Sequence, residues 1–364
     1  MSRILLLASD ASVVHTRRWG EWFHDSGWEV IVASFVDAAI PGAEVHVLEG
    51  GTHSALARAR AARHLRRLVR AVGPNVVNAH YLTTYGAIAA KAGVEPLVVT
   101  AWGPDVLTEP ASSPHLMAAA RNAIRRAQAV TTVAAHMEQA VVALGARRED
   151  VTSVPFGVDT ELFVRRLRMG RTGPLRIIST RALEPVYDVK SVIRAFHVLT
   201  GTGHHLRLDV VGDGSQRPML ESLVDHLGLR GLVTFHGRIE QEPMVDRLND
   251  AAVFVSAAHS DGNNICLNEA MACGCFPVVT RIPANEQWIR DGTNGILFAP
   301  GDVAGLAAAI LAAIDDRQLR LDAASLNTGI VASRANWKVA TAQMMRVFDR
   351  VDTRGRAPLG SFGN

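Results

Sequence analysis

The sequence predicts an α/β protein of two domains, each a doubly wound parallel sheet covered by helices. Short apolar runs typical of buried parallel strands alternate with amphipathic helical segments along the chain. The length of 364 residues exceeds the usual size of one hydrophobic core. A charged segment with glycine and proline, residues 165–174, separates two sets of strands and has the composition of a linker.

The first domain is predicted over residues 1–165. Its strands are expected at 3–8, 29–35, 44–49, 76–80, 97–101 and 129–134. Its helices are expected at 17–27, 54–72, 114–128 and 136–144. Ligands of such sheets bind beyond the carboxyl ends of the strands. We therefore expect side chains that follow strands to face a site: His15, Thr16, His80, Trp102 and Asp105. A loop or capping role for His15 and a structural role for His80 are the alternatives.

The second domain is predicted over residues 172–334. Strands are expected at 175–180, 206–211, 233–239, 252–258 and 276–279, and helices at 217–228, 242–251, 263–273 and 305–316. A last helix, 332–351, is expected to end the fold, followed by a flexible tail at 352–364.

Residues 261–302 carry the strongest chemical signal. A loop with Asp261 leads into a helix that Asn263, Asn264 and Asn268 supply with capping groups, and Gly274 ends that helix. The start of a helix presents backbone N–H groups and a positive dipole end, which suit a phosphate. Asp261 and Glu269 bracket this point and accept hydrogen bonds from hydroxyls. Phosphates flanked by hydroxyl-rich groups describe a nucleotide sugar.

Composition excludes several classes of protein. The net charge of +3 is too small to indicate nucleic-acid binding. The three cysteines, Cys266, Cys273 and Cys275, fit neither a disulfide framework nor a zinc site. No apolar stretch reaches the roughly 18 residues of a membrane span, and the apolar run near the N-terminus is too short for a signal peptide. We therefore expect a cytoplasmic protein, at most peripheral on the inner face of the membrane.

The 261–302 stretch resembles the signature of retaining glycosyltransferases of family 4, which have the GT-B fold. The matching residues are Asp261-x7-Glu269, Ala270-Met271-Ala272-Cys273-Gly274, Pro277-Val278-Val279, Glu286, Gly295-Ile296-Leu297 and Gly301-Asp302. The segment Val154–Phe163 is similar to the family's Pro-x-Gly-Val-Asp element, and Trp102–Asp105 to its His-Gly-x-Asp element, in the Trp-Gly-x-Asp form of a subset. The resemblance implies two Rossmann-like domains facing across a cleft, with helix 335–351 packing back on the first and a kink near Trp337.

The resemblance also implies an activity and its residues. A hexose would move, with retention and without a metal or other cofactor, from a nucleoside-diphosphate sugar to a hydroxyl acceptor. Arg181 and the backbone N–H groups at Asn264 and Ile265 would neutralise the departing diphosphate, while Glu269 would hold the ribose and Asp261 the sugar. Further donor-binding candidates are Asn263, Gly212, Gly237, Arg238 and Glu286. His15, Thr16, His80 and Trp102 would bind the acceptor, with Asp105 in the catalytic set.

Three departures from the family pattern keep an alternative open. Asp261 stands where the family has Glu, Trp102 where it has His, and no lysine follows Arg181 at the expected place. A non-catalytic nucleotide-sugar-binding subunit is therefore the alternative; an epimerase or phosphorylase on the same fold fits 261–302 less well. Glu286 is either a donor contact or a structural helix-start acid.

The predicted helix 54–72 carries six arginines, at 58, 60, 63, 66, 67 and 70. It is either a solvated face or a surface that docks on anionic lipid. Base, sugar and acceptor are not determined by the sequence.

Overall fold

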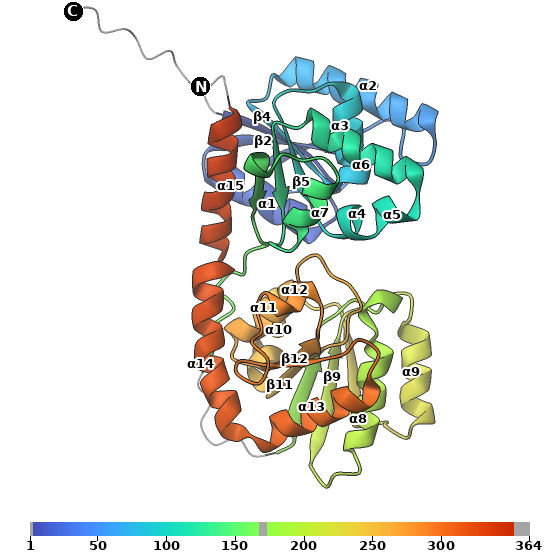
Figure 1. The fold of residues 1–364 in the computed structure, drawn as a ribbon, viewed down its shortest axis with the longest axis vertical. Helices are drawn as coiled ribbons and strands as arrows, with labels where there is room; N and C mark the ends of the chain where they lie inside the picture. The colour runs from blue at the N-terminus through green and yellow to red at the C-terminus, as the bar shows by residue number, and fades with distance from the viewer. Residues whose placement is uncertain (1–2, 167–172, 353–364) are drawn as a thin grey trace, which may run out of the picture. The chain divides into compact units, whose positions relative to one another are not determined.

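The computed structural model describes residues 3–166 and 173–352. These residues form two compact units, described separately below: unit 1 contains residues 3–155 and 341–352, and unit 2 contains residues 156–340 (Figure 1). The first domain was predicted to end at residue 165, whereas the division falls between Pro155 and Phe156. Most of the predicted linker, 167–172, and the tail from 353 onward lie outside the described residues.

Unit 1 is built on a parallel sheet of seven strands in the order β3-β2-β1-β4-β5-β6-β7. Its strands are β1 (Arg3–Ala8), β2 (Trp28–Ser34), β3 (Ala43–Val47), β4 (Val76–His80), β5 (Leu97–Ala101), β6 (Ala129–Thr132) and β7 (Val151–Ser153). Each strand pairs in parallel with its neighbours, and the central ones are fully buried. The predicted strands are confirmed, while β7 is an addition, because its three half-buried residues carry no apolar run.

Helices cover both faces of this sheet. They are α1 (Val14–Asp25), α2 (Ala55–Val72), α3 (Ala87–Ala92), α4 (Pro104–Leu107), α5 (Glu109–Ser112), α6 (Pro114–Arg126), α7 (Met137–Ala143) and the end of α15 (Trp337–Val351). Phe348 of α15 stacks on Phe23 of α1 and meets Trp28 edge-on. Asp349 pairs with Arg3. An aromatic cluster and an ion pair therefore anchor the end of the chain on unit 1.

Unit 2 contains a parallel sheet of six strands in the order β10-β9-β8-β11-β12-β13. The strands are β8 (Leu175–Ser179), β9 (Leu206–Val211), β10 (Val233–Gly237), β11 (Val253–Ser256), β12 (Phe276–Thr280) and β13 (Ile296–Phe298). The helices are α8 (Val189–Leu199), α9 (Arg217–His226), α10 (Gln241–Asp250), α11 (Ile265–Ala272), α12 (Pro283–Glu286), α13 (Val303–Asp315) and α14 (Arg317–Arg334). The doubly wound α/β prediction is confirmed for both units.

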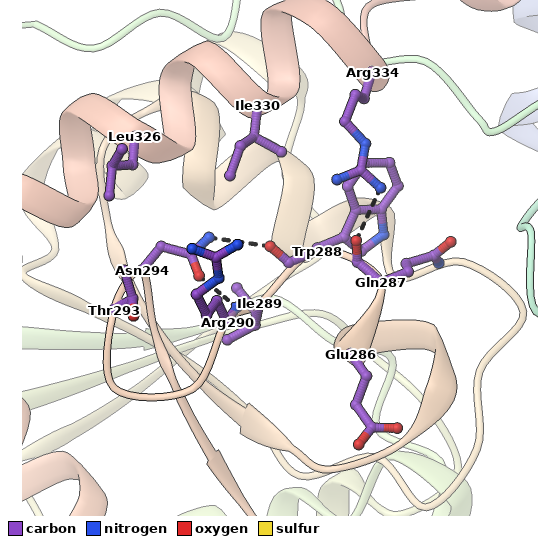
Figure 2. Close-up of a pocket in the computed structure, with 10 residues that line it drawn as sticks. All are labelled: Glu286, Gln287, Trp288, Ile289, Arg290, Thr293, Asn294, Leu326, Ile330 and Arg334. Atoms are coloured by element: carbon purple, nitrogen blue, oxygen red, sulfur yellow. Dashed lines mark hydrogen bonds between the residues drawn. The ribbon is translucent and has the colours of Figure 1, made fainter.

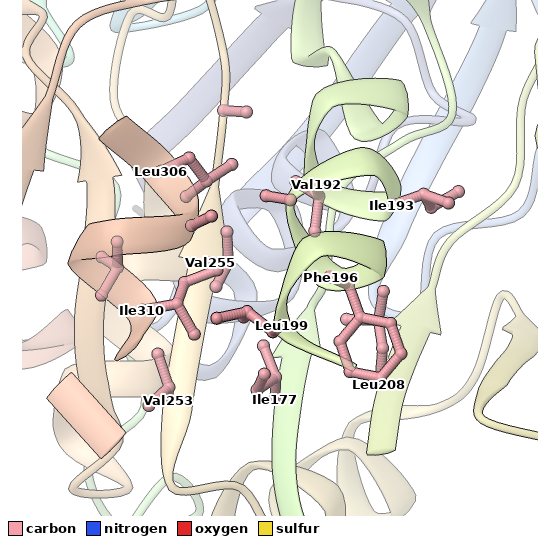
Figure 3. Packing of buried hydrophobic residues seen from close by; sticks show 14 of the residues in the cluster. Ile177, Val192, Ile193, Phe196, Leu199, Leu208, Val253, Val255, Leu306 and Ile310 are labelled. Carbon is pink, nitrogen blue, oxygen red and sulfur yellow. The ribbon is translucent and has the colours of Figure 1, made fainter. Parts of the chain in front are cut away.

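The core of unit 2 lies on both faces of its sheet. On one face, α8 and α13 bury apolar side chains against β8, β9 and β11 (Figure 3). Phe196 of α8 and Ile310 of α13 belong to this cluster. On the other face, α10, α11 and α14 bury a second cluster, which includes Leu267 and Val331. Because both faces are covered, β11 and β12 are fully buried, as expected for the inner strands of a parallel sheet.

The predicted last helix over 332–351 is two helices. Helix α14 ends at Arg334 and α15 begins at Trp337. The two residues between them leave the helical pattern because the backbone there bonds to the segment after β7: Val158 N–H donates to Ala335 O (2.7 Å), and Trp337 N–H donates to Val158 O (2.9 Å). Gly157 makes this close approach possible, since a Cβ there would lie 2.3 Å from Cα of Trp337.

Helix α2 matches its prediction closely. The Ser54 side chain accepts from Ala57 N–H at its start, and Gly73, at φ 62°, ends it in the left-handed conformation. Its buried face is Ala61, Ala62, Leu65 and Leu68. Among the described residues, no helix is both long and apolar enough to span a bilayer.

Gly157→Ala is expected to destabilise unit 2 by about 1–3 kcal/mol, because the methyl group would be forced against the backbone of Trp337. Urea unfolding measures the difference. The matched control is Gly329→Ala in the exposed middle of α14, where a Cβ meets nothing within 4 Å and helix propensity adds about 0.5–1 kcal/mol of stability. A Gly157→Ala variant as stable as the wild type would disprove the close approach.

Candidate functional site

The centre of the site in unit 2 is Arg181, which follows β8 and is only 6% exposed. One terminal nitrogen donates to Oδ1 of Asn264 (2.7 Å) and the other to Oδ2 of Asp261 (2.6 Å). The guanidinium also lies 4.1 Å from the ring centroid of Tyr187. Burial by itself would lower the pKa of Arg181, but Asp261, Cys266 and Tyr187 together raise it, so the group keeps its charge. Its Nε is buried and has no hydrogen-bond partner among the described residues.

Two glycines at the ends of neighbouring strands hold the backbone of Arg181 in place. Gly212 adopts φ 137°, and a Cβ there would lie 2.2 Å from the Arg181 carbonyl oxygen. Gly212 N–H donates to Gly237 O (2.8 Å), and Gly237 also has a positive φ of 67°. Both predicted donor-binding glycines thus lie at the carboxyl ends of neighbouring strands, on the same side of the sheet as Arg181. Arg238, which follows Gly237, is exposed.

Of the three asparagines predicted to cap α11, only Asn264 does so, because the side-chain amides of Asn263 and Asn268 have no hydrogen-bond partner among the described residues. The Asn264 side chain accepts from Leu267 N–H. Asn264 has φ −75° and ψ 78°, close to an inverse γ-turn, and Ile265 N–H donates to Asn263 O (2.9 Å). The tight turn thus uses the Ile265 N–H in this conformation, and its role toward a diphosphate stays a prediction.

A chain of side-chain amides extends from Arg181 into the sheet. Asn264 accepts from Arg181 through Oδ1 and donates through Nδ2 to Oδ1 of Asn285 (3.0 Å). Asn285 in turn donates to the Thr280 carbonyl (2.8 Å). All three side chains are buried. Asn285 was not predicted from the sequence, because an Asn after Pro and Ala on a short helix carries no signal of its own.

The other predicted donor-binding residues lie around this centre with different exposure. Asn263 is buried, and neither its side-chain oxygen nor its nitrogen has a partner among the described residues. A buried amide without a partner is uncommon and marks a position for a ligand or water. Glu269 is partly buried on α11, whereas Glu286, at the end of α12, is exposed.

Tyr187 is a site residue that the sequence did not reveal. It packs against Ala258, Ile282 and Ala284 and stacks on Arg181. Its pKa is raised, mainly by burial. The following residue, Asp188, adopts the left-handed conformation at φ 44° and caps α8 through its side chain. The segment Pro185–Tyr187 therefore places an aromatic ring beside Arg181, in the part of the chain where the family pattern has a lysine.

In unit 1, the four predicted acceptor-binding side chains meet at the carboxyl ends of β1, β4 and β5. His80 bonds Ser9 through Nδ1 and Asn78 through Nε2, both at 2.9 Å, and Ser9 bonds Thr16 at 2.7 Å. The ring centroid of Trp102 lies 5.3 Å from that of His80 and 5.8 Å from that of His15. His80 and Thr16 are buried, whereas His15 and Trp102 are partly exposed.

Both histidines are held neutral. Burial lowers the pKa of His80 to about 3, with a smaller contribution from His15. The pKa of His15 falls to about 4 because of burial and the nearby Arg18. The cluster is therefore a set of uncharged donors and acceptors beside an indole ring, which suits a hydroxylated ligand rather than an ion.

Asp105 is fully buried, and its carboxylate is fully used. Oδ1 accepts from the backbone N–H groups of Trp102 (3.0 Å) and Gly103 (2.8 Å), and Oδ2 from Leu82 N–H (2.8 Å). Burial raises its pKa to about 6 against these three hydrogen bonds. The carboxylate therefore fixes the turn that carries Trp102, and the place of Asp105 in the catalytic set stays a prediction.

Next to this turn, the chain after β4 makes one π-helical turn over Tyr81–Gly86. Tyr81 has φ 67°, which is unusual for a residue with a side chain. Its hydroxyl and that of Thr83 donate to the two carboxylate oxygens of Glu109, at 2.6 and 2.5 Å. Such strained turns concentrate at functional sites. Neither the turn nor Glu109 was predicted from the sequence.

Within residues 3–166 and 173–352, no group of three or more His, Cys, Asp or Glu side chains is arranged to hold a metal ion.

Two family models match consecutive parts of the chain. The model described as "Glycosyl transferase 4-like" matches residues 3–134, and "Glycosyl transferases group 1" matches residues 169–326. The first match lies in unit 1 and the second covers most of unit 2.

Curated relatives have related descriptions. The chain is 28% identical over 295 residues to a protein named glycogen synthase from Mycobacterium tuberculosis H37Rv, covering 78% of this chain and 71% of that one. It is 29% identical over 211 residues to a phosphatidyl-myo-inositol mannosyltransferase from Mycolicibacterium smegmatis, covering 57% and 53%.

Solved structures share the fold over almost the full length. A sucrose-phosphate synthase from Thermosynechococcus elongatus has a TM-score of 0.82 at 17% identity, covering 96% of this chain and 99% of that one. Anabaena HepE, solved in complex with UDP-glucose, has a TM-score of 0.81 at 19% identity, covering 96% and 100%.

The neutral histidines predict loss of stability in acid. The pKa of His80 in the folded protein, about 3, lies below the ordinary value of 6.5, so between these pH values the unfolded chain binds a proton and the native state does not. The free energy of unfolding is therefore unaffected by His80 above pH 6.5 and decreases as the pH falls below it, by about 2 kcal/mol at pH 5. Urea unfolding of the wild type and of His80→Gln at pH 7 and pH 5 measures this. The variant is expected to lose that part of the pH dependence; an unchanged dependence would refute the neutral state.

Proposed function

Because the chain is a glycosyltransferase with the GT-B fold, we propose that it is a retaining, metal-independent hexosyltransferase that uses a nucleoside-diphosphate sugar. Unit 2 binds the donor, and unit 1 supplies the site for a hydroxyl acceptor, which is a glycan, a lipid-linked sugar or a small molecule. The proposal extends to the base: HepE was solved with UDP-glucose, and UDP-hexoses are the first donors to test.

The single observation that carries the proposal is the buried Arg181. A guanidinium with five donors is planar and suits two phosphate oxygens at once. Here two nitrogens are directed at Asp261 and Asn264, and Nε has no partner among the residues described. A diphosphate on this fork would replace the charge of Asp261 and use the remaining donor. The buried amide of Asn263 and the start of α11 lie in the adjoining loop and supply further polar groups.

On the donor side, each residue receives one role in the proposed reaction. Glu269 accepts the ribose hydroxyls, and Asp261 accepts hydroxyls of the hexose once a phosphate has taken its place on Arg181. Gly212 and Gly237 hold the strand ends that carry Arg181, and Arg238 lies beside the base. Tyr187 covers the guanidinium with its ring, 4.1 Å from centroid to guanidinium carbon, and so helps to orient it. Glu286 borders the donor from the end of α12.

Catalysis in this proposal is stabilisation of the leaving group. Negative charge builds on the diphosphate oxygen only as the glycosidic bond breaks, so Arg181 contributes more in the transition state than in the ground state. The acceptor hydroxyl attacks from the same face as the departing phosphate, and a phosphate oxygen takes its proton. Asp261 is therefore not a nucleophile, in contrast to the second carboxylate of retaining glycosidases.

On the acceptor side, the partly exposed His15 and Trp102 contact the acceptor. The buried Thr16 and His80 position them through hydrogen bonds and ring contacts. Asp105 fixes the backbone at Trp102. An uncharged cluster with an indole face fits the apolar face and the hydroxyls of a sugar ring or polyol.

Arg181→Gln is expected to lower kcat for transfer, or for slow donor hydrolysis without an acceptor, roughly 100-fold, because one charge-assisted contact to the leaving group is worth about 1.5–3 kcal/mol.

Glu269→Gln is expected to raise the Kd for UDP about tenfold with less effect on kcat. Arg194→Gln on α8, exposed and without a charged partner in the described chain, is the matched control. Calorimetry and a UDP-release assay measure both constants. Full activity of Arg181→Gln would remove the proposed role, and UDP binding with no turnover on any acceptor would favour a binding subunit.

We further propose that unit 1 contacts anionic membrane through α2. Five of its arginines are exposed: Arg60, Arg63, Arg66, Arg67 and Arg70. Leu56 on the same helix is 70% exposed. Clustered basic residues beside an exposed apolar side chain are typical of peripheral binding to anionic lipid.

Binding to phosphatidylglycerol vesicles is expected to weaken roughly tenfold or more in the double variant Arg63→Glu/Arg67→Glu, since each basic residue near the surface contributes about 1 kcal/mol, and to weaken with added salt. The same charge change at two exposed arginines of unit 2, Arg194→Glu/Arg317→Glu, is the control. Co-sedimentation measures the bound fraction. Equal losses in the two double variants would mean that net charge, and not α2, determines binding.

A further inference from the structure

A pocket lies in unit 2 beside the segment that follows Asn285. It is a hollow of about 360 Å³ between the segment 286–294 and one side of α14. Figure 2 shows that the loop supplies Arg290, Thr293 and Asn294, and that Ile330 and Arg334 extend from α14. Unit 2 alone supplies all of its lining residues.

Two arginines make the pocket electropositive. Arg290 is exposed, and its guanidinium has no ion pair or hydrogen bond to any described residue; Figure 2 shows it directed toward α14. Arg334 is held in place: it donates to the Gln287 carbonyl (3.0 Å) and lies 5.0 Å from the ring centroid of Trp288. The carboxylate of Glu286 is directed away from both arginines (Figure 2). One unpaired and one preoriented guanidinium are the donors that an oxyanion requires.

Apart from Glu286 and the two arginines, the lining is apolar or polar but uncharged. Leu326, 49% exposed, and Ile330 present aliphatic side chains from α14, and Thr293 adds an exposed hydroxyl. Trp288 lines the pocket at 5% exposure, and its indole Nε1 is buried with no hydrogen-bond partner among the described residues. An anionic group beside an aliphatic wall suits a ligand with a phosphate at one end and a less polar body.

The pocket is joined to Arg181 by one short segment. Asn285 precedes the pocket residues 286–290 directly and bonds Asn264, which holds Arg181. The loop beyond is rigid as well: Asn294 accepts from Arg290 N–H and donates to the Trp288 carbonyl and to Asn327 of α14. A ligand that restrains Arg290 therefore also restrains segment 285–290. Asn285, at the other end of this segment, bonds Asn264 and so influences the position of Arg181.

We propose that this pocket binds a small phosphate monoester and that its occupation tightens nucleotide binding at Arg181. The phosphate lies between Arg290 and Arg334, and the body of the ester packs on Leu326 and Ile330. The ligand favours the position of segment 283–290 in which Asn285 holds Asn264, so that a nucleotide meets Arg181 already in place. This coupling, unlike the pocket itself, rests on the proposed function.

The test uses the full chain with phenyl phosphate and inorganic phosphate as probes. The indole N–H signal of Trp288, identified by its absence in Trp288→Phe, reports on the pocket in ¹H–¹⁵N spectra. Phenyl phosphate is expected to shift this signal in a saturable way and to bind more tightly than inorganic phosphate. Arg290→Gln is expected to weaken binding at least tenfold, and the control Arg194→Gln to leave it unchanged. No saturable shift, or equal binding by Arg290→Gln, would overturn the site.

The coupling is read from the Kd for UDP, measured by calorimetry with and without phenyl phosphate. It is expected to fall at least threefold in the wild type and to stay constant in Arg290→Gln. By linkage, UDP must tighten phenyl phosphate binding by the same factor. An unchanged Kd for UDP beside a saturable Trp288 shift would refute the coupling and leave the site in place. Absence of any UDP binding would count against the proposed function instead, because the Trp288 titration does not require it.

Discussion

The ion pair between Arg181 and Asp261 is the interaction on which the rest of unit 2 depends. A buried guanidinium is costly unless a negative partner and hydrogen-bond acceptors compensate for its lost hydration. Asp261 and Asn264 provide this compensation, and Tyr187 covers one face of the group. Its position therefore requires Gly212 at the neighbouring strand end, the γ-turn before α11, and Asn285 behind Asn264.

Unit 1 has a similar strand order, but the groups buried at its strand ends differ in charge from those of unit 2. At the carboxyl ends of its central strands the buried groups are neutral: Ser9, Asn78 and His80 exchange hydrogen bonds, and burial keeps the imidazole unprotonated. The only buried carboxylate there, among the described residues, is compensated by backbone N–H groups at Asp105 and not by a cation. Asp352, also buried in this unit, pairs with Arg3 away from these strand ends. The strand ends of unit 2 thus hold a buried positive charge, while those of unit 1 carry uncharged hydrogen-bonding groups.

The sequence predicted well what depends on local pattern. Apolar runs located nearly all strands, because a parallel sheet covered on both faces needs continuous apolar residues. Capping residues located α2 and α11. The family resemblance predicted a kink near Trp337, but the full break of the last helix at residues 335–336 was not predicted, because it depends on a backbone contact with the segment at Gly157, far away in sequence. The π-helical turn at Tyr81 was missed for a similar reason: its strained φ is supported by Glu109, and propensity says nothing about such a partner. For the candidate site, motif positions identified Arg181, Asp261 and Asn264, but not Tyr187 or Asn285, whose importance arises only from what they touch.

The departures from the family pattern become intelligible through the same ion pair. An aspartate at 261 is one methylene shorter than glutamate, and here it lies within 2.6 Å of Arg181. In the proposed reaction the donor's phosphates replace Asp261 as the partner of Arg181. The donor must then supply hydroxyl groups that donate hydrogen bonds to Asp261. A bare diphosphate can do only the first, and it leaves a poorly compensated carboxylate beside a second negative charge. A sugar nucleotide can do both, because its hexose carries hydroxyls next to the diphosphate. The short acid therefore couples recognition of the two halves of the donor. Tyr187 stacks on Arg181 where the family pattern has a lysine nearby. In this proposal, recognition of both halves of the donor therefore depends on the single positive charge of Arg181.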